Sequence, residues 1–221
     1  MPEPAAVVVL ISGQGRNLQA LIDGIAAGRV PARIAAVISN RADAPGLARA
    51  QRAGIATAVL SHRDYASREA YDAALAAAID AHAPDLVLLA GFMRILTPGF
   101  TQAYAGRLIN IHPSLLPRHP GLDTHRRALE AGDVEHGATV HFVTEALDGG
   151  PPIIQGGFTV LPQDDAQSLA VRVMEQVEQR IYPQAVAWLA RRELLLDGDG
   201  VRFRGLRLPA PLGLGDLEEG F

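Results

Sequence analysis

One segment near the N-terminus, AVVVLISGQGRNLQALI at residues 6–22, already indicates the architecture of the protein. Residues 6–12 are a nearly continuous run of apolar, largely β-branched side chains, which is typical of a strand buried on both faces. After residue 17, apolar side chains recur every three or four positions, at Leu18, Leu21, Ile22 and Ile25. This spacing predicts a helix over residues 17–27. The segment is therefore a strand, a glycine-containing loop and a helix.

The same alternation continues through the first half of the chain. Further apolar runs of strand length lie at residues 34–39, 56–60, 86–90 and 108–111, and segments with helical spacing lie at 45–53 and 67–82. Strands that are apolar on both faces and alternate with helices predict a parallel sheet with helices on both sides.

The second half follows a different pattern. Residues 137–144 and 152–160 both have strand character and no helical segment separates them, so we expect an antiparallel pair. A long helix over residues 165–191 follows, and then a hairpin over 193–208 that turns at 197–200. The predicted class is α/β: a doubly wound, mostly parallel, Rossmann-like sheet with an antiparallel C-terminal strand pair.

Length and composition limit the class of protein. The chain has 221 residues, 48% hydrophobic and 20% charged, which indicates a single folded domain. We assign this domain to residues 1–208 and expect residues 209–221, rich in Pro, Gly and acidic side chains, to form a flexible tail. The formal net charge of −4 gives no indication of a nucleic-acid or membrane partner.

Two residue types are missing from the sequence. Without cysteine the chain has no thiolate nucleophile, and without lysine it has neither a Schiff-base amine nor the lysine of a Walker loop. No targeting segment is visible, so we expect a cytoplasmic protein.

The loop after the first strand has the character of an anion site. Its two glycines let a ligand approach the backbone, and N–H groups at the start of a helix favour an anion. Leu18 stands where a dinucleotide-binding fingerprint has its third glycine, and no acidic residue closes the second strand. Two interpretations remain open: a tight turn, or a cradle for one phosphate made by the N–H groups of Gly15, Arg16 and Asn17. The Arg16 side chain either adds a charged contact or points to solvent.

A second candidate site lies at the end of the strand expected at residues 108–111. Asn110 and His112 are two positions apart, so an extended strand projects them to the same side, and Pro113 follows directly. An amide donor next to an imidazole suits a carbonyl oxygen that becomes an oxyanion. Asp148, in a glycine- and proline-rich turn, is a candidate for keeping the imidazole protonated.

Simpler structural roles are possible for each of these three residues. Asn110 and His112 could bind loop carbonyls, and Asp148 could only form its turn. Spacing alone does not bring Asp148 to His112.

Six motifs connect these residues to a known family. They are Ser12-Gly13-x-Gly15-x-Asn17-Leu18-Gln19, Ala90-Gly91-Phe92-Met93-Arg94-Ile95-Leu96, Asn110-Ile111-His112-Pro113-Ser114-Leu115-Leu116-Pro117, His136-Gly137-Ala138-Thr139-Val140-His141-Phe142-Val143, Leu147-Asp148-Gly149-Gly150-Pro151 and Ile181-Tyr182-Pro183. In this order, from about Val7 to Arg204, the chain resembles the formyltransferase family that uses 10-formyltetrahydrofolate.

The resemblance implies an activity and a catalytic set. The implied reaction transfers the formyl group of 10-formyltetrahydrofolate, as co-substrate, to the primary amine of 5-phosphoribosylglycinamide in purine synthesis. It proceeds by direct attack and needs no metal. The implied catalytic residues are Asn110, His112 and Asp148.

The resemblance also implies where the two small molecules bind. The phosphate of 5-phosphoribosylglycinamide is expected on Gly15, Arg16 and Asn17, and Glu178 is expected to contact the same substrate. The implied folate residues are Arg68, Met93, Arg94, Ile95, Leu96, Asn110 and Val143, with Arg68 toward the glutamate tail and residues 143–148 closing on the pterin ring. Position 16 is often serine in the family, so Arg16 leaves the side-chain contact with the phosphate open.

Three alternatives to this function remain. They are hydrolysis of the formyl group, its transfer to another amine such as that of a charged tRNA, and a noncatalytic nucleotide-binding module. We expect a monomer or a homodimer. Among the other histidines, His141 is predicted to be a core residue and His136 an ordinary turn residue, whereas His119 and His125 could line the substrate side.

Overall fold

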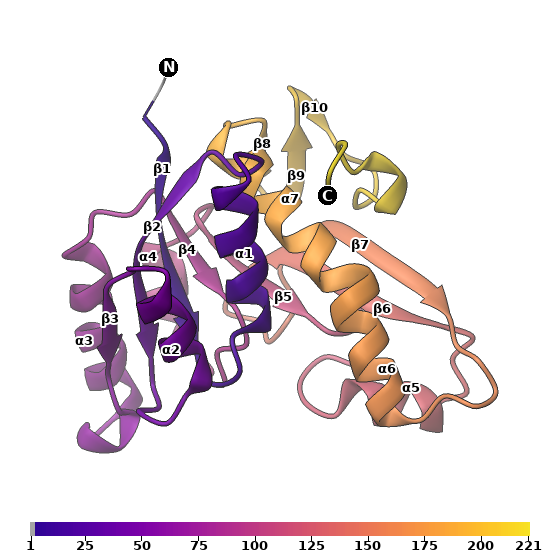
Figure 1. Ribbon diagram of the computed structural model, residues 1–221, viewed down its shortest axis with the longest axis horizontal. Helices are drawn as coiled ribbons and strands as arrows, with labels where there is room; N and C mark the ends of the chain where they lie inside the picture. Colours follow the sequence, from indigo (N-terminus) through magenta and orange to yellow (C-terminus); the bar gives the residue numbers. More distant parts are fainter. Residues whose placement is uncertain (1–2) are drawn as a thin grey trace.

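The computed structural model describes residues 3–221 and is built on a seven-stranded sheet (Figure 1). Its strands are β1 (Ala5–Ile11), β2 (Ala32–Ser39), β3 (Thr57–Val59), β4 (Leu86–Leu89), β5 (Leu108–His112), β6 (Glu135–Phe142) and β7 (Pro152–Thr159). They are ordered β3-β2-β1-β4-β5-β6-β7 across the sheet. Strands β1 to β5 are parallel, whereas β6 runs antiparallel to both β5 and β7. The predicted mostly parallel sheet with its antiparallel C-terminal pair is confirmed.

Helices cover both faces of the sheet because its central strands are apolar on both sides. In β1, Val7, Val9 and Ile11 belong to one core cluster, and Val8 and Leu10 belong to the other. Helices α1 (Arg16–Ala26), α2 (Pro45–Arg52) and α7 (Gln179–Ala190) contribute to the first cluster, and α3 (Arg68–Asp80) and α4 (Pro98–Ala103) contribute to the second (Figure 1). No helix formed by residues 3–221 is long and apolar enough to cross a membrane.

The helical parts differ from the prediction in two ways. The long helix expected over residues 165–191 consists of α6 (Ala166–Arg172), a π-helical segment (Val173–Glu178) and α7. Two short helices, α4 and α5 (Thr124–Glu130), lie where we predicted no element. They have six and seven residues, too few for a helical spacing of apolar side chains to be recognised.

The C-terminal part forms a second, smaller sheet and then returns to the domain. Strands β8 (Leu194–Asp197), β9 (Gly200–Phe203) and β10 (Leu206–Arg207) are antiparallel and lie within the expected hairpin segment. Residues 209–221, expected to be a flexible tail, contact β7 and α7: the backbone of Leu212 bonds to that of Ile153 and Gln155, and Glu218 accepts a hydrogen bond from Nε1 of Trp188. That residues 209–221 are flexible stays a prediction.

The segments with candidate site residues meet at one edge of the sheet. Strands β1, β4 and β5 are parallel neighbours, so the residues that follow them lie close together. The N–H of Ser12 donates to the backbone oxygen of Gly91 (3.1 Å), and its Oγ accepts from the N–H of Met93 (2.8 Å). In open parallel sheets, ligands bind at this edge.

Candidate active site

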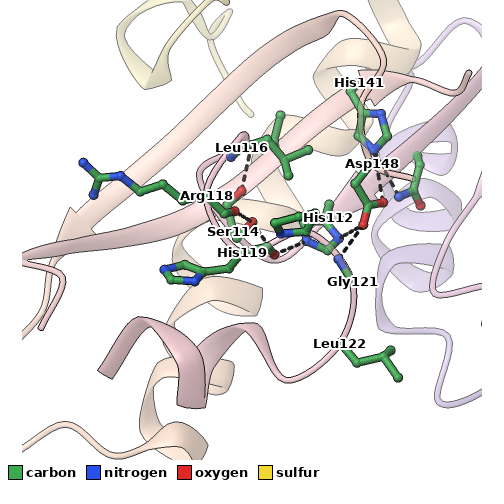
Figure 2. A network of polar contacts seen from close by, with 12 residues as sticks. His112, Ser114, Leu116, Arg118, His119, Gly121, Leu122, His141 and Asp148 are labelled. Carbon is green, nitrogen blue, oxygen red and sulfur yellow. Dashed lines mark hydrogen bonds and ion pairs between the residues drawn. The ribbon is translucent and has the colours of Figure 1, made fainter. Parts of the chain in front are cut away.

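His112 is buried at the end of β5, and both of its ring nitrogens face hydrogen-bond acceptors (Figure 2). Nε2 is 2.9 Å from the backbone oxygen of His119, and Nδ1 is 3.4 Å from Oδ2 of Asp148. Because a carbonyl oxygen only accepts, Nε2 carries a hydrogen that it donates to His119. An imidazolium at this position would have an acceptor for each of its two N–H groups.

Asp148 reaches His112 from a turn with special backbone geometry. Its φ is +49°, in the left-handed region that few side chains adopt. Its Oδ2 also accepts a hydrogen bond from the N–H of Gly121 (2.8 Å). Nearby Gly150 has no room for a side chain, because a Cβ atom there would lie 1.8 Å from the backbone oxygen of Phe142. The turn thus holds Asp148 against His112, a contact that spacing in the sequence does not show.

Asn110 is oriented by His141 on β6, a residue that we predicted to belong to the core. The two are direct neighbours across β5 and β6, and Nδ2 of Asn110 is 3.2 Å from Nε2 of His141. Nδ1 of His141 is 2.9 Å from the backbone oxygen of Phe142, so Nδ1 carries the hydrogen and Nε2 accepts from Asn110. Burial lowers the pKa of His141, in agreement with this neutral form.

His141 is both buried, as predicted, and part of the site, which sequence reasoning missed. Its Nε2 is also 3.8 Å from Oδ1 of Asp148. The contact with Asn110 leaves the second N–H of the amide without a partner among residues 3–221. No signal in either strand could have revealed this, because the register between β5 and β6 is set by the whole sheet.

Two buried hydroxyls and a half-buried amide hold the loop between β5 and α5 (Figure 2). Oγ of Ser114 donates to the backbone oxygen of Arg118 (2.6 Å), and Oγ1 of Thr139 donates to the backbone oxygen of Ser114 (2.7 Å). Nε2 of Gln155 donates in turn to Oγ1 of Thr139 (2.9 Å). Side chains from β6 and β7 therefore set the path of the loop that brings His119 to the imidazole.

The predicted anion-binding loop precedes α1. Gly15 has a φ of +68°, and a Cβ atom there would lie 2.7 Å from Cα of Gly46, so this position requires glycine. Arg16 and Asn17 follow in the first turn of the helix, where N–H groups have no acceptor within the helix. The side chain of Arg16 is exposed, which leaves it accessible to a ligand of this loop.

Glu178, the last residue of the π-helical segment, lies next to this loop although it is 161 positions from Asn17. Both side chains are buried, and Nδ2 of Asn17 donates to Oε2 of Glu178 (2.6 Å). Burial raises the pKa of Glu178, and the hydrogen bond from Asn17 opposes this effect. Oδ1 of Asn17 is buried without a hydrogen-bond partner in the described residues. The structure thus joins two segments that the family resemblance assigns to one substrate.

Most of the implied folate residues follow β4. Met93 and Ile95 are 64% and 60% exposed, which is high for large apolar side chains, whereas Leu96 is buried. Arg68, the first residue of α3, donates from Nη2 to the backbone oxygen of Ile95 (3.0 Å). Val143 packs against the core cluster that contains Leu96. The first turn of α3 therefore contacts the segment that follows β4.

Arg94 points its guanidinium toward α3. Its Cζ lies 5.9 Å from the ring centre of Tyr71. Nε of Arg94 and the hydroxyl of Tyr71 are both buried without a hydrogen-bond partner in residues 3–221. Arg94 therefore lies over the ring of Tyr71 without a hydrogen bond from its Nε to the Tyr71 hydroxyl.

His136, which we predicted to be a turn residue, lies instead in β6, where it is buried and faces His125 of α5. Nδ1 of His125 is 2.9 Å from Nε2 of His136. Burial lowers the pKa of His136 to about 4 and lowers the pKa of His125 as well. In the described part of the chain, no group of three or more histidine or acidic side chains is arranged to hold a metal ion.

Known proteins resemble the chain over most of its length. Residues 5–186 match the formyl transferase family. The phosphoribosylglycinamide formyltransferase of Escherichia coli (strain K12) is 53% identical over 203 residues, which covers 92% of this chain and 95% of that protein. The solved structure of the Coxiella burnetii phosphoribosylglycinamide formyltransferase in complex with CHES has 47% identity and a TM-score of 0.92, and covers 96% of this chain and 99% of that one.

A more distant structure shares the fold. The formyltetrahydrofolate deformylase of Pseudomonas putida KT2440 has 26% identity and a TM-score of 0.82, and the match covers 92% of this chain and 71% of that one. The family match extends over more than half of the chain, and two relatives, at 53% and 47% identity, are named phosphoribosylglycinamide formyltransferase. The chain therefore belongs to the formyl transferase family.

Proposed function

We propose that the protein transfers the formyl group of 10-formyltetrahydrofolate to the primary amine of 5-phosphoribosylglycinamide, a step of purine synthesis. One observation carries the proposal: Asn110, His112 and Asp148 converge at the C-terminal edge of the sheet where β5 ends. Proteins named for this activity are 53% and 47% identical to the chain.

Asn110 and His112 donate hydrogen bonds to the formyl oxygen while the amine attacks the formyl carbon. His119 accepts from Nε2–H of His112, so the donors assigned to the oxyanion are Nδ1–H of His112 and the second N–H of Asn110. The 3.4 Å separation between Nδ1 of His112 and Oδ2 of Asp148 exceeds that of a strong charge-assisted hydrogen bond, so the Nδ1–H group can also donate to a second acceptor. Donors fixed in advance stabilise the charge that develops on the oxygen.

Asp148 supplies the negative charge beside the imidazolium. Its side chain is only 10% exposed, so the attraction is screened less than between surface charges. We also assign to Asp148 the movement of a proton, through water, from the attacking nitrogen to the leaving folate nitrogen. Direct attack requires no covalent bond to the enzyme.

The two small molecules are assigned to neighbouring parts of the same edge. The N–H groups of Gly15, Arg16 and Asn17 hold the phosphate of 5-phosphoribosylglycinamide at the start of α1, where the helix dipole favours an anion. Glu178 contacts the same substrate. Because both reactants are held side by side, orientation contributes to the rate.

The folate co-substrate is assigned to the residues after β4 and β6. Arg68 and Arg94 attract the carboxylates of its glutamate tail, and the exposed Met93 and Ile95 cover its aromatic part. Leu96, Val143 and Asn110 complete this side of the site. We further propose a single domain over residues 1–208 that works in the cytoplasm as a monomer or a homodimer, with small molecules as its partners.

Hydrolysis is the second candidate function, because the deformylase of Pseudomonas putida shares the fold. An assay with purified protein distinguishes the two: loss of the formyl group is followed by absorbance with a 10-formyltetrahydrofolate analogue, with and without 5-phosphoribosylglycinamide. Loss that requires the ribonucleotide supports transfer, and loss without it supports hydrolysis. No reaction in either case, while both ligands bind, would contradict the catalytic proposal.

A further inference from the structure

We propose that His119 and Asp133 are a pair of positioning residues that fix the orientation of His112. The inference rests on the proposed function only for its kinetic consequence, because the contacts themselves lie within the chain. His119 makes two contacts: its backbone oxygen binds His112, and its imidazole binds Asp133.

The side-chain contact is short and largely shielded from water. Nε2 of His119 lies 2.7 Å from Oδ2 of Asp133, and the two side chains are 13% and 15% exposed. The N–H of Asp133 donates to the backbone oxygen of Ala128 (3.0 Å), so the carboxylate is anchored at the end of α5. Arg118 is the other charged group facing it, with Nη1 3.7 Å from Oδ1. The carboxylate can therefore serve as a fixed attachment point for the loop.

The backbone of His119 needs such an attachment. Its φ is +52°, in the left-handed region, which is unfavourable for a residue with a Cβ atom. This conformation directs the backbone oxygen of His119 toward Nε2 of His112, at 2.9 Å (Figure 2). Oγ of Ser114 lies 3.3 Å from the same oxygen. Without the contact to Asp133, we expect residue 119 to relax toward ordinary φ values and to turn its carbonyl away from His112.

The consequence concerns the second nitrogen of His112. In a catalytic histidine, the partner of one ring nitrogen decides how the other is protonated and where it points. If the oxygen of His119 leaves Nε2, the ring is free to rotate, and Nδ1–H no longer points at Asp148 and the reaction site. Turnover should fall, whereas the binding of either substrate should change little, because neither positioning residue belongs to the set that we assign to substrate binding.

The test compares four variants with the wild-type protein. His119→Ala and Asp133→Asn weaken or remove the contact, and His119→Gln keeps an N–H donor that can reach Asp133. Arg126→Ala is the matched control, because it breaks an exposed ion pair with Asp123 in the same loop and helix without touching the pair. We expect kcat to fall about 10- to 100-fold in His119→Ala, with KM values within about twofold, and to recover largely in His119→Gln.

A readout independent of activity follows the Nε2–H of His112 by nitrogen-15 NMR of histidine-labelled, ligand-free protein. We expect this hydrogen to exchange slowly with water in the wild-type protein and in His119→Gln, and faster in His119→Ala and Asp133→Asn. Unchanged exchange, or a loss of kcat no larger than that of Arg126→Ala, would overturn the proposal. If His119→Ala does not fold, His119→Gln and Asp133→Asn decide by the same criteria. If the wild-type protein proves inactive, the proposed function fails, and the exchange measurement still tests the pair.

Discussion

The folded protein should lose stability in mild acid, and replacing His136 by asparagine should remove a large part of that loss. His136 is 1% exposed, and its Nε2 is 2.9 Å from Nδ1 of His125. Burial, reinforced by the neighbouring histidines, lowers its pKa from 6.5 to about 4. As the pH falls through this window the unfolded chain takes up a proton that the folded protein refuses, so the native state loses stability. The shift corresponds to about 3 kcal/mol, against the 5–15 kcal/mol that is ordinary for folded proteins.

Urea unfolding of the wild-type protein and His136→Asn, between about pH 7.5 and about pH 4, measures this contribution. At the upper pH the variant should be less stable, because it loses the contact with His125. On acidification the wild-type protein should lose about 3 kcal/mol more than the variant, since the carboxylates titrate equally in both. His82→Asn, at a partly exposed histidine after α3, is the control. Parallel pH curves for the wild-type protein and His136→Asn would refute the reasoning.

Three further predictions concern the site. His112→Ala should lower turnover about 100- to 1000-fold, the usual cost of removing one oxyanion donor, and near-normal turnover in a steady-state assay would remove His112 from the proposed mechanism. Gly150→Ala should disrupt the turn of Asp148, because its Cβ atom would lie 1.8 Å from the backbone oxygen of Phe142. Activity and melting temperature should both fall. If neither changes, the turn adapts to the added side chain. Glu178→Gln should raise the free energy of unfolding at neutral pH, because burial raises the pKa of Glu178 and disfavours its charged form; this gain should vanish below about pH 4.5. The same variant should bind 5-phosphoribosylglycinamide more weakly, as measured by calorimetry. Unchanged affinity would remove Glu178 from the substrate site.

Elements with long, regular patterns were predictable because their pattern is local. The apolar run before Gly13 and the helical spacing after Asn17 correspond to β1 and α1, with bounds that differ by one residue. The antiparallel pair β6 and β7 was also predictable, because no helical segment separates the two runs. The short helices α4 and α5 were not, because their caps and tertiary contacts decide them rather than a repeating pattern.

Part of the site was predictable from strand geometry. The period of two in an extended chain places Asn110 and His112 on one side, and the structure has both at the end of β5. The assignment of Asp148 and Glu178 came from the family resemblance, since neither residue stands out by its local pattern. Two contacts were not predicted: that of His141 with Asn110, which joins neighbouring strands, and that of the His119 backbone with His112, which depends on the path of a loop that a linear pattern does not describe.

By itself, then, the sequence determined the alternation of strands and helices, the glycine loop before α1 and the shared side of Asn110 and His112. These features follow from the backbone periods and from the conformational freedom of glycine, which act over a few residues. Only the tertiary structure decided that Asp148 lies 3.4 Å from His112, that His141 orients Asn110 and that Asn17 meets Glu178. Those distances depend on the register of β5 against β6 and on how the loops return over the sheet edge, which the packing of the whole chain sets.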